Sequence, residues 1–210
     1  MEKKVLRKIF MEQQSRISAE KSMAAGEAML SLLSGEAFWQ EARSVFCFIS
    51  MSGEPDTTPI ILGALNSGKT VCVPRTGKNR LMETVPIMDD SGVLSMPMDR
   101  DAFSRIIAAW PLSYNIPEPP ASIHAEDPSK LDLVIVPSVA VDRRGCRLGH
   151  GAGYYDHFIN GFQTAKKRPL FAAIQFEELL MDEPLPREPY DMLVDMIVTE
   201  NEIIIPVSFY

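Results

Sequence analysis

The stretch from Leu131 to Asn160 constrains the fold more than any other part of this chain. It opens with a short apolar run, Leu133 to Val136, whose β-branched residues are typical of a strand buried on both faces. A polar turn at residues 142–145 follows, and glycine then stands at every second position from Gly149 to Gly153. Residues 154–159 are predicted to form the first turns of a helix. A buried strand, a glycine-rich loop and a helix in this order indicate an α/β fold.

The glycine-rich loop predicts a binding site for phosphate. Glycine has no side chain to keep a ligand from the backbone and tolerates positive φ, so successive N–H groups can converge on an anion. Arg147 adds a positive charge, and Asp156, just inside the helix, could hold Mg²⁺ against bound phosphates. Asp191 or Asp195 could join Asp156, and spacing does not choose between them. The glycine spacing matches neither the dinucleotide nor the P-loop motif, so a tight structural turn is the alternative.

A second segment matches the P-loop pattern letter for letter but is predicted to have another role. It runs from Gly63 to Thr70, with Gly68 and Lys69 near its end. A phosphate-binding P-loop needs a strand before the loop and a helix after it. Here a predicted helix precedes the segment, and a strand starting at Val71 follows it. We therefore expect Gly68 to end the helix and Lys69 to interact with the helix dipole.

The other predicted elements alternate between helices and strands along the chain. Amphipathic spacing and capping residues such as Ser18 mark the helices, and short apolar runs mark the strands. The prolines between residues 114 and 120 argue against regular structure there. We expect a single domain over residues 1–210, an α/β three-layer sandwich with a mostly parallel central sheet flanked by helices. The expected helices cover residues 3–16, 18–35, 59–65 and 101–110, the strands 45–49, 71–73, 81–88, 133–136, 169–174 and 196–199, and the turns 75–80 and 89–92.

Composition argues against several classes of partner. The 210 residues carry a formal net charge of −7, whereas a general nucleic-acid binder needs a dominant basic face. The chain shows neither a signal-peptide core nor an apolar run of the roughly 20 residues that a membrane span requires. We expect a soluble, cytoplasmic monomer without nucleic-acid or membrane partners. Cys47, Cys72 and Cys146 lie far apart without C-x-x-C spacing, so we expect reduced, non-catalytic thiols.

Charged residues outside the glycine loop are further candidates for the site. Lys3 and Arg7 are four residues apart and share one side of the first helix, where they either face solvent or reach a polyphosphate. Glu54 follows the first buried strand, and ligands of open α/β sheets lie outside the carboxyl ends of the strands. Glu118 belongs either to the site or to a connecting loop.

The run RLGHGAGYYD from Arg147 to Asp156, preceded by LDLVIVP from Leu131 to Pro137, resembles the signature of the 5-formyltetrahydrofolate cyclo-ligase family. The resemblance extends in order over nearly the whole chain. It is also carried by Lys3-x-x-Leu6-Arg7, residues 50–57, residues 68–74, residues 116–119 and residues 191–199.

The resemblance implies an enzyme that uses ATP and Mg²⁺ to convert 5-formyltetrahydrofolate to 5,10-methenyltetrahydrofolate, releasing ADP and phosphate. The formyl oxygen would attack the γ-phosphate of ATP, N10 would close the ring, and no covalent intermediate with the enzyme would form. Another ATP-dependent kinase or ligase on the same scaffold, or a non-catalytic regulator that binds folate or nucleotide, is the alternative.

The resemblance also implies roles for particular residues. It assigns Asp156 and Asp191 to Mg²⁺, which favours Asp191 over Asp195. The residues expected to be catalytic, through stabilisation of charge on the transferring phosphoryl group, are Arg147, Lys3 and Arg7. The implied ATP contacts are Lys3, Lys4, Val5, Leu6, Arg7, Arg147, Leu148, Gly149, His150, Gly151, Ala152, Gly153, Tyr154 and Tyr155. The implied contacts to the folate substrate are Ile49, Glu54, His150, Gly151, Ala152, Gly153 and Tyr154.

Overall fold

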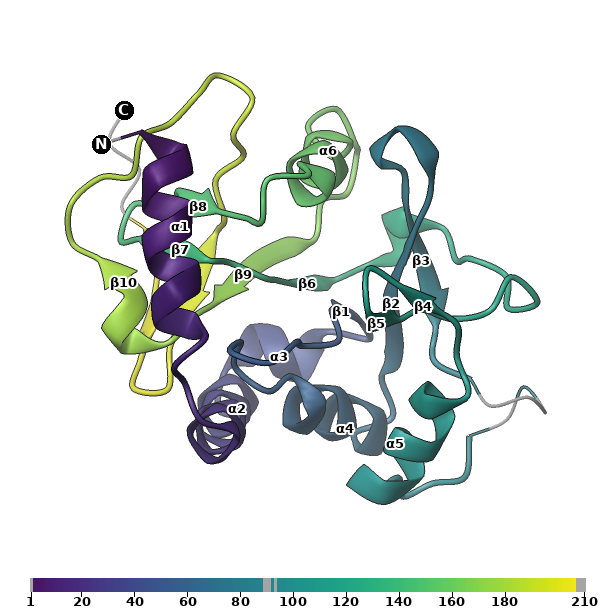
Figure 1. Ribbon diagram of the computed structural model, residues 1–210. Coiled ribbons are helices and arrows are strands. Elements are labelled where there is room, and N and C mark those ends of the chain that lie inside the picture. The colour runs from purple at the N-terminus through teal and green to yellow at the C-terminus, as the bar shows by residue number, and fades with distance from the viewer. Residues whose placement is uncertain (1, 89–91, 93, 207–210) are drawn as a thin grey trace.

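A seven-stranded, mostly parallel sheet forms the centre of the computed structural model, which describes residues 2–88, 92 and 94–206 (Figure 1). The strand order is β12-β11-β9-β6-β1-β2-β3, and only the edge strands β3 and β12 run antiparallel to their neighbours. The strands are β1 (Ser44–Cys47), β2 (Thr70–Thr76), β3 (Met82–Pro86), β6 (Leu133–Val136), β9 (Leu170–Ile174), β11 (Met196–Val198) and β12 (Ile203–Ile204).

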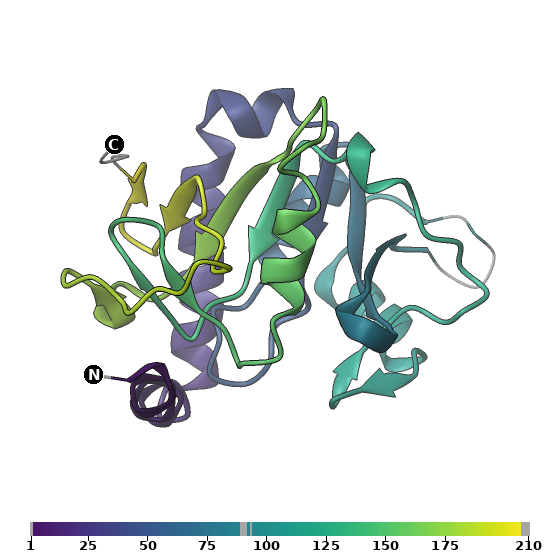
Figure 2. The same ribbon diagram turned by 90° about the horizontal axis from the view of Figure 1, so that it is seen from above.

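Helices cover both faces of the sheet. The helices are α1 (Lys3–Gln14), α2 (Ala19–Ser34), α3 (Ala37–Glu41), α4 (Thr58–Asn66), α5 (Arg100–Ala108) and α6 (Tyr154–Asn160). In Figure 2, α6 lies on the opposite side of the sheet from α2. The three-layer α/β arrangement expected from the sequence is confirmed.

The burial of alternate strand residues explains these layers. In β1, Val45 and Cys47 pack in the core cluster that includes α2, α3, α4 and α5, whereas Phe46 packs in the cluster under α6. Side chains of a strand point alternately to opposite faces, so a strand that is apolar at every position must be covered on both sides. Each such side chain stabilises the fold by roughly 1.5–3 kcal/mol when it is fully buried.

The P-loop-like segment has the order of elements that the sequence predicts. Helix α4 ends at Asn66, Gly68 adopts a left-handed φ of +76°, and β2 begins at Thr70. The expected role of Lys69 is wrong in one respect, because its ammonium group does not bind the C-terminus of α4, the helix that precedes it. It donates a hydrogen bond of 2.7 Å to the carbonyl of Ala42, the residue at the C-terminal cap of α3.

Two segments predicted to be irregular contain strands. β4 (Leu112–Ser113) and β5 (Ile116–Pro117) form a small hairpin, so the expectation for residues 114–120 is wrong at its start. Pro117 is tolerated because this two-stranded sheet needs few backbone donors. The predicted turn at 75–80 is also too long, since β2 continues to Thr76 and pairs with β3. The predicted turn at 89–92 lies largely outside the described residues.

A third, three-stranded sheet supports the start of the glycine-rich loop. It consists of β7 (Ala140–Asp142), β8 (Arg147–Leu148) and β10 (Leu180–Met181), in the order β10-β7-β8. The polar turn between β7 and β8 is held by the carboxylate of Asp142, which accepts hydrogen bonds from the backbone of Arg144 and Cys146. Among the described residues, none of the helices is long and apolar enough to cross a lipid bilayer.

Candidate functional site

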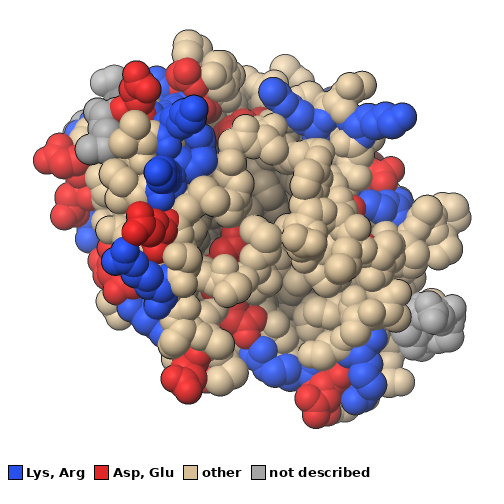
Figure 3. Space-filling model, viewed as in Figure 1, with Lys and Arg blue, Asp and Glu red and all other residues tan. Residues whose placement is uncertain are grey.

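A cavity of about 920 Å³ lies between α1, the glycine-rich loop and the wall formed by β2, β3 and the β4–β5 hairpin. Figure 3 shows a hollow in this face of the molecule, with basic side chains gathered along α1 on one side. The predicted site residues that line the cavity are Lys3, Arg7, Ile49, Glu54, the whole run 147–156 and Asp191. Lys4, Val5 and Leu6 do not line it, because a helix presents residues four apart, such as Lys3 and Arg7, to the same side.

The glycine-rich loop is exposed to the cavity and is tied to α1. Gly151 and Gly153 have φ angles of +107° and +76°, a region that residues with a side chain rarely adopt. The Nε of Arg7 donates a 2.7 Å hydrogen bond to the carbonyl of Gly149. A Cβ placed on Gly151 would lie 3.5 Å from the guanidinium carbon of Arg7. The loop therefore presents bare backbone and an adjacent cation to the cavity.

Arg147 and Asp156 form an ion pair beneath this loop. Arg147 is buried, and its Nη2 lies 3.1 Å from Oδ1 of Asp156, which also accepts a 3.2 Å hydrogen bond from the backbone of Met192. Burial lowers the pKa of Arg147, and the negative charge of Asp156 opposes that shift. The Nε of Arg147 and the hydroxyl of Tyr155 are buried without a hydrogen-bond partner among the described residues. Buried polar groups of this kind normally have a partner, so the Nε–H of Arg147 and the hydroxyl of Tyr155 are each able to donate a hydrogen bond to water or to a ligand.

Lys3 links α1 to the segment that carries Asp191. Its ammonium group forms ion pairs with Asp191 and with Glu188, the latter at 2.8 Å. Burial opposes the charge of Lys3, but the hydrogen bonds and charges of the two carboxylates outweigh it and raise the pKa. The hydrogen bond from Lys3, helped by one from Tyr190, lowers the pKa of Glu188. An anion that enters the cavity would compete with these carboxylates for Lys3.

The two aspartates fit a magnesium ion that also binds a phosphate. Asp156 and Asp191 line the same cavity, and Oδ2 of Asp156 and Oδ1 of Asp191 have no hydrogen bond from any described residue. No cluster of three or more His, Cys, Asp or Glu suited to a metal occurs in the part of the chain that the structure describes. The remaining ligands would be phosphate oxygens and water, which is usual for Mg²⁺. Asp195 does not line the cavity, because its two oxygens bind Arg168 and the backbone of Phe171.

Glu54 is the buried carboxylate at the carboxyl end of β1. Only 4% of it is exposed, and Oε2 accepts a 2.8 Å hydrogen bond from the backbone of Met51. Its Oε1 lies 3.2 Å from Nε2 of His150, so the imidazole and the carboxylate are in hydrogen-bond contact, and both residues line the cavity. Glu118 also lines the cavity, with its carboxylate bound to the hydroxyl of Thr76 at 2.6 Å and to the backbone N–H of Thr76 at 3.1 Å.

Several cavity residues were not found from the sequence. Some of them, such as Pro137 and His157, lie in segments that the sequence already singles out, although no role was assigned to them there. The others reach the cavity through long-range strand pairing or loop packing that no local pattern marks. The full set is Phe48, Met51, Pro74, Thr76, Arg80, Met82, Ser113, Tyr114, Ile116, Pro137, His157, Asn160, Glu188 and Tyr190.

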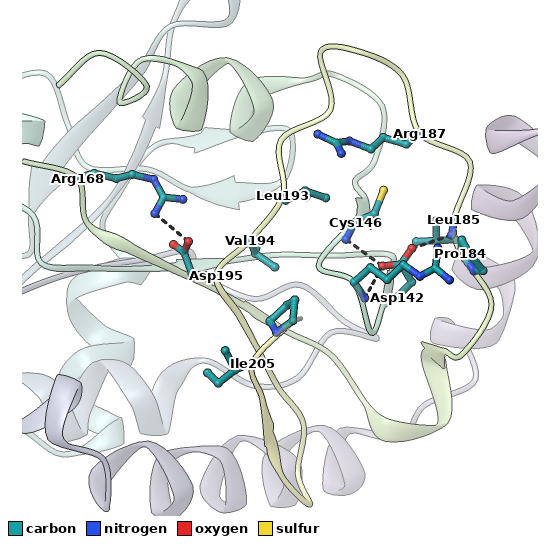
Figure 4. Close-up of a pocket in the computed structure, with 12 residues that line it drawn as sticks. Asp142, Cys146, Arg168, Pro184, Leu185, Arg187, Leu193, Val194, Asp195 and Ile205 are labelled. Carbon is teal, nitrogen blue, oxygen red and sulfur yellow. Dashed lines mark hydrogen bonds and ion pairs between the residues drawn. The ribbon is translucent and has the colours of Figure 1, made fainter. Parts of the chain in front are cut away.

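A second cavity, of about 860 Å³, is lined by charged side chains that are bound to other parts of the chain (Figure 4). The guanidinium of Arg187 donates hydrogen bonds of 3.3 and 3.4 Å to the carbonyl of Asp191. Arg168 is paired with Asp195, and the carboxylate of Asp142 is bound by three backbone N–H groups. The Cys146 thiol is buried, and burial raises its pKa to about 11. Cys47 and Cys72 are also buried free thiols, and burial raises the pKa of Cys72 to about 12. A thiolate nucleophile is therefore disfavoured at all three positions.

Comparison with known proteins gives one consistent family. The family model described as "5-formyltetrahydrofolate cyclo-ligase family" matches residues 1–200. A 5-formyltetrahydrofolate cyclo-ligase of Saccharomyces cerevisiae is 31% identical over 193 residues, which cover 87% of this chain and 85% of that protein. A probable 5-formyltetrahydrofolate cyclo-ligase of Caenorhabditis elegans is 30% identical over 193 residues, which cover 90% of this chain and 88% of that protein.

Among solved structures, the NMR structure of the Aquifex aeolicus 5,10-methenyltetrahydrofolate synthetase has the same fold. It superimposes with a TM-score of 0.75 at 24% identity, covering 100% of this chain and 95% of that one.

Proposed function

The chain belongs to the 5-formyltetrahydrofolate cyclo-ligase family and is an enzyme of this class, and we propose that it phosphorylates the formyl oxygen of 5-formyltetrahydrofolate with ATP before ring closure. One observation carries the proposal. The glycine-rich loop, the cations Lys3, Arg7 and Arg147, and two aspartates line one cavity together with the buried carboxylate of Glu54. This cavity could hold both a polyphosphate and a folate.

The proposed reaction has two steps that balance without a group on the protein. The formyl oxygen attacks the γ-phosphorus, an O–P bond forms, and the bond from phosphorus to the ADP oxygen breaks. N10 then attacks the activated formyl carbon, loses its proton, and expels inorganic phosphate, which leaves the five-membered methenyl ring. Catalysis by alignment of two bound substrates needs no protein nucleophile, and the three buried thiols offer none.

The cations would stabilise the charge on the transferring phosphoryl group. Arg7 is positioned for this role by its hydrogen bond to the carbonyl of Gly149. Lys3 would exchange part of its contact with Asp191 for a phosphate oxygen. Arg147, which is almost fully buried, holds Asp156 in place and contributes its charge from beneath the loop.

Asp156 and Asp191 would hold the magnesium ion. When bound, Mg²⁺ neutralises charge on the phosphates and fixes their orientation. The oxygens of Asp156 and Asp191 that lack a hydrogen bond from the described residues are the available ligands. Release of Lys3 from Asp191 would free that carboxylate for the ion at the time when Lys3 meets the nucleotide.

The folate would lie against the carboxyl end of β1. Glu54 would accept hydrogen bonds from the pterin, while Ile49 and Tyr154 would supply apolar surface and a ring face. His150 is held beside Glu54 and is within reach of the same ligand, so it is the candidate for taking the proton from N10.

The test is an assay of purified protein with ATP, Mg²⁺ and 5-formyltetrahydrofolate, monitored by the absorbance of the methenyl product. We expect product in a one-to-one ratio with ADP. ADP formation without methenyl product would indicate a kinase or ligase with another acceptor. Binding of both ligands without any turnover would indicate a regulator and contradict the proposal.

A further inference from the structure

Arg80 is a cation at the cavity that the proposed reaction has not used. It lies at the tip of the β2–β3 hairpin, lines the cavity and is exposed to solvent. Its guanidinium forms no hydrogen bond or ion pair with any residue that the structure describes. Its Nη1 would lie 3.6 Å from a Cβ placed on Gly153, which puts the guanidinium beside the glycine-rich loop.

The backbone fixes this position. Asn79 and Arg80 both have left-handed φ angles, +57° and +61°, although neither is glycine. The turn is closed by a 2.9 Å hydrogen bond from Gly77 to Leu81, and the hydroxyl of Tyr154 donates a 3.2 Å hydrogen bond to the carbonyl of Gly77. Strained, non-glycine backbone of this kind persists where the surrounding structure holds it, and it concentrates at ligand sites.

Arg80 approaches the cavity from the wall opposite to α1. Arg7 lies against Gly149 and Gly151, whereas Arg80 lies against Gly153 at the other end of the loop. The two cations therefore have different neighbours. The wall next to Arg80 is largely apolar and carries Pro74, Met82, Tyr114 and Ile116.

The carboxylate of Glu118 on this wall does not neutralise Arg80. Both of its oxygens accept hydrogen bonds from Thr76. Glu83 on β3 is paired with Arg75 at 2.8 Å. A chain with a net charge of −7 thus leaves an unpaired arginine at the mouth of its cavity, among the residues that the structure describes.

We propose that Arg80 binds the glutamate carboxylates of the folate substrate, while the apolar wall beside it contacts the aminobenzoyl ring. The inference rests on the proposed function. The reacting formyl group must lie inside the cavity near the phosphate, so the opposite end of the folate extends toward the mouth. That end carries two carboxylates, and the planar guanidinium of arginine binds a carboxylate through two parallel hydrogen bonds.

The experiment measures, by titration calorimetry, the dissociation constants of 5-formyltetrahydrofolate and of the carboxamide of 5-formyltetrahydropteroate (below, the pteroate). This pteroate lacks the glutamate and carries no carboxylate. The variants are Arg80→Ala, Arg80→Lys and, as the matched control, Lys78→Ala. Lys78 is an exposed cation on the same turn that does not line the cavity. We expect Arg80→Ala to weaken binding of the folate about tenfold and binding of the pteroate less than twofold, as for a lost charged hydrogen bond. Arg80→Lys should recover part of the affinity, and Lys78→Ala should bind both like the unmodified protein.

An equal loss for folate and pteroate in Arg80→Ala, or no loss for either, would overturn the inference. A loss of affinity for an ATP analogue with folate binding unchanged would also overturn it and move Arg80 to the nucleotide. Because calorimetry needs no turnover, these results are separable from the proposed function. That function fails first if the unmodified protein binds folate without forming the methenyl product, and the assignment of Arg80 is then still decided by the pteroate comparison.

Discussion

Two glycine-containing segments of this chain are candidates for phosphate binding by their residues, but only one lines the cavity. Residues 63–70 match the P-loop pattern in every letter, whereas residues 147–156 match no common phosphate motif. In the structure, 147–156 line the cavity of about 920 Å³, and none of residues 63–70 does. The two segments differ in the secondary-structure elements that precede and follow them.

The order of elements decides the role of each segment. Gly68 follows a helix, so its left-handed φ of +76° ends α4, and Lys69 turns to the carbonyl of Ala42 and the ring of Trp39. Gly151 and Gly153 use the same backbone freedom after a strand and ahead of a helix, and both glycines line the cavity. Glycine therefore ends a helix in the first segment and forms part of the cavity wall in the second.

The largest expected effect is on kcat, which should fall for substitutions in residues 147–156 and stay nearly unchanged for a substitution in residues 63–70. Asp156→Asn removes a charge from the proposed magnesium site, and we expect kcat to fall roughly 100-fold, in the range seen when one charge-stabilising group is lost. Arg147→Ala should cause a loss of the same order, because Asp156 loses its ion pair. Lys69→Ala should keep kcat within about twofold, since Lys69 does not line the cavity.

Steady-state assays of the methenyl product, with circular dichroism to verify folding, measure this difference. A large loss of kcat in folded Lys69→Ala would place the nucleotide at the P-loop-like segment and reverse the comparison. Near-normal turnover in Asp156→Asn would remove the proposed magnesium site.

The next largest effect is expected when a glycine of either segment is replaced by alanine. Gly151→Ala introduces a side chain at φ +107° and 3.5 Å from the guanidinium carbon of Arg7, so we expect kcat to fall about tenfold through displacement of the loop. Gly68→Ala meets no atom within 4 Å and should leave kcat unchanged. It should lower the free energy of unfolding by about 1 kcal/mol, because alanine is strained at its φ of +76°.

Paired kinetic assays and urea unfolding distinguish these results. If Gly68→Ala loses activity in proportion to Gly151→Ala, the two glycine runs do not have separate roles. If Gly151→Ala loses only stability, the loop is structural rather than part of a binding site.

The sequence was sufficient where the physical signal is local. The apolar runs at β1, β6 and β9, the capping hydroxyl of Ser18 and the helix-ending Gly68 depend on neighbouring residues, and the structure contains all of them. Central strands buried on both faces and helices between them then leave few arrangements other than a layered α/β fold.

The opposite wall of the cavity could not be predicted because it depends on pairing between distant residues. Arg80 reaches the cavity because β2 continues to Thr76 and pairs antiparallel with Met82 on β3. β4 and β5 have two residues each, too few for an alternating pattern, so Tyr114 gave no signal. Spacing also could not separate Asp191 from Asp195, whose oxygens bind Arg168 and a backbone N–H outside the cavity.

A smaller effect concerns the stability contributed by Lys69. Lys69→Met keeps the aliphatic length but loses the 2.7 Å hydrogen bond to Ala42 and the cation 5.7 Å from the centre of the Trp39 ring. We expect the free energy of unfolding to fall by about 0.5–1.5 kcal/mol, the range for a typical single hydrogen bond, because solvent screens the charge of this partly exposed lysine. Urea titration measures this change. An unchanged midpoint together with lower turnover would contradict the structural role of Lys69.

The smallest expected effect is a difference between Lys3 and Lys69 in how their contribution to stability depends on pH. Lys3 binds carboxylates, whereas Lys69 binds a carbonyl that does not titrate. The pKa of Lys3 is raised above its ordinary 10.5, so its contribution is present below that value and is lost as pH rises through the raised value. The pKa of Glu188 is lowered from its ordinary 4.5, so its contribution is present above 4.5 and is lost as pH falls.

Lys3→Ala should therefore lower the thermal midpoint most between the two ordinary pKa values, 4.5 and 10.5, and progressively less toward acid and toward strong alkali. Lys69→Met should lower it by the same amount from acid to neutral pH, because its acceptor has no proton to gain. Thermal unfolding of both variants across this pH range, in constant ionic strength, gives the two curves. A flat curve for Lys3→Ala would mean that its carboxylate contacts add nothing to stability, because the cost of removing partly buried charges from water offsets their attraction. The place of Lys3 at the cavity would then serve the bound nucleotide alone.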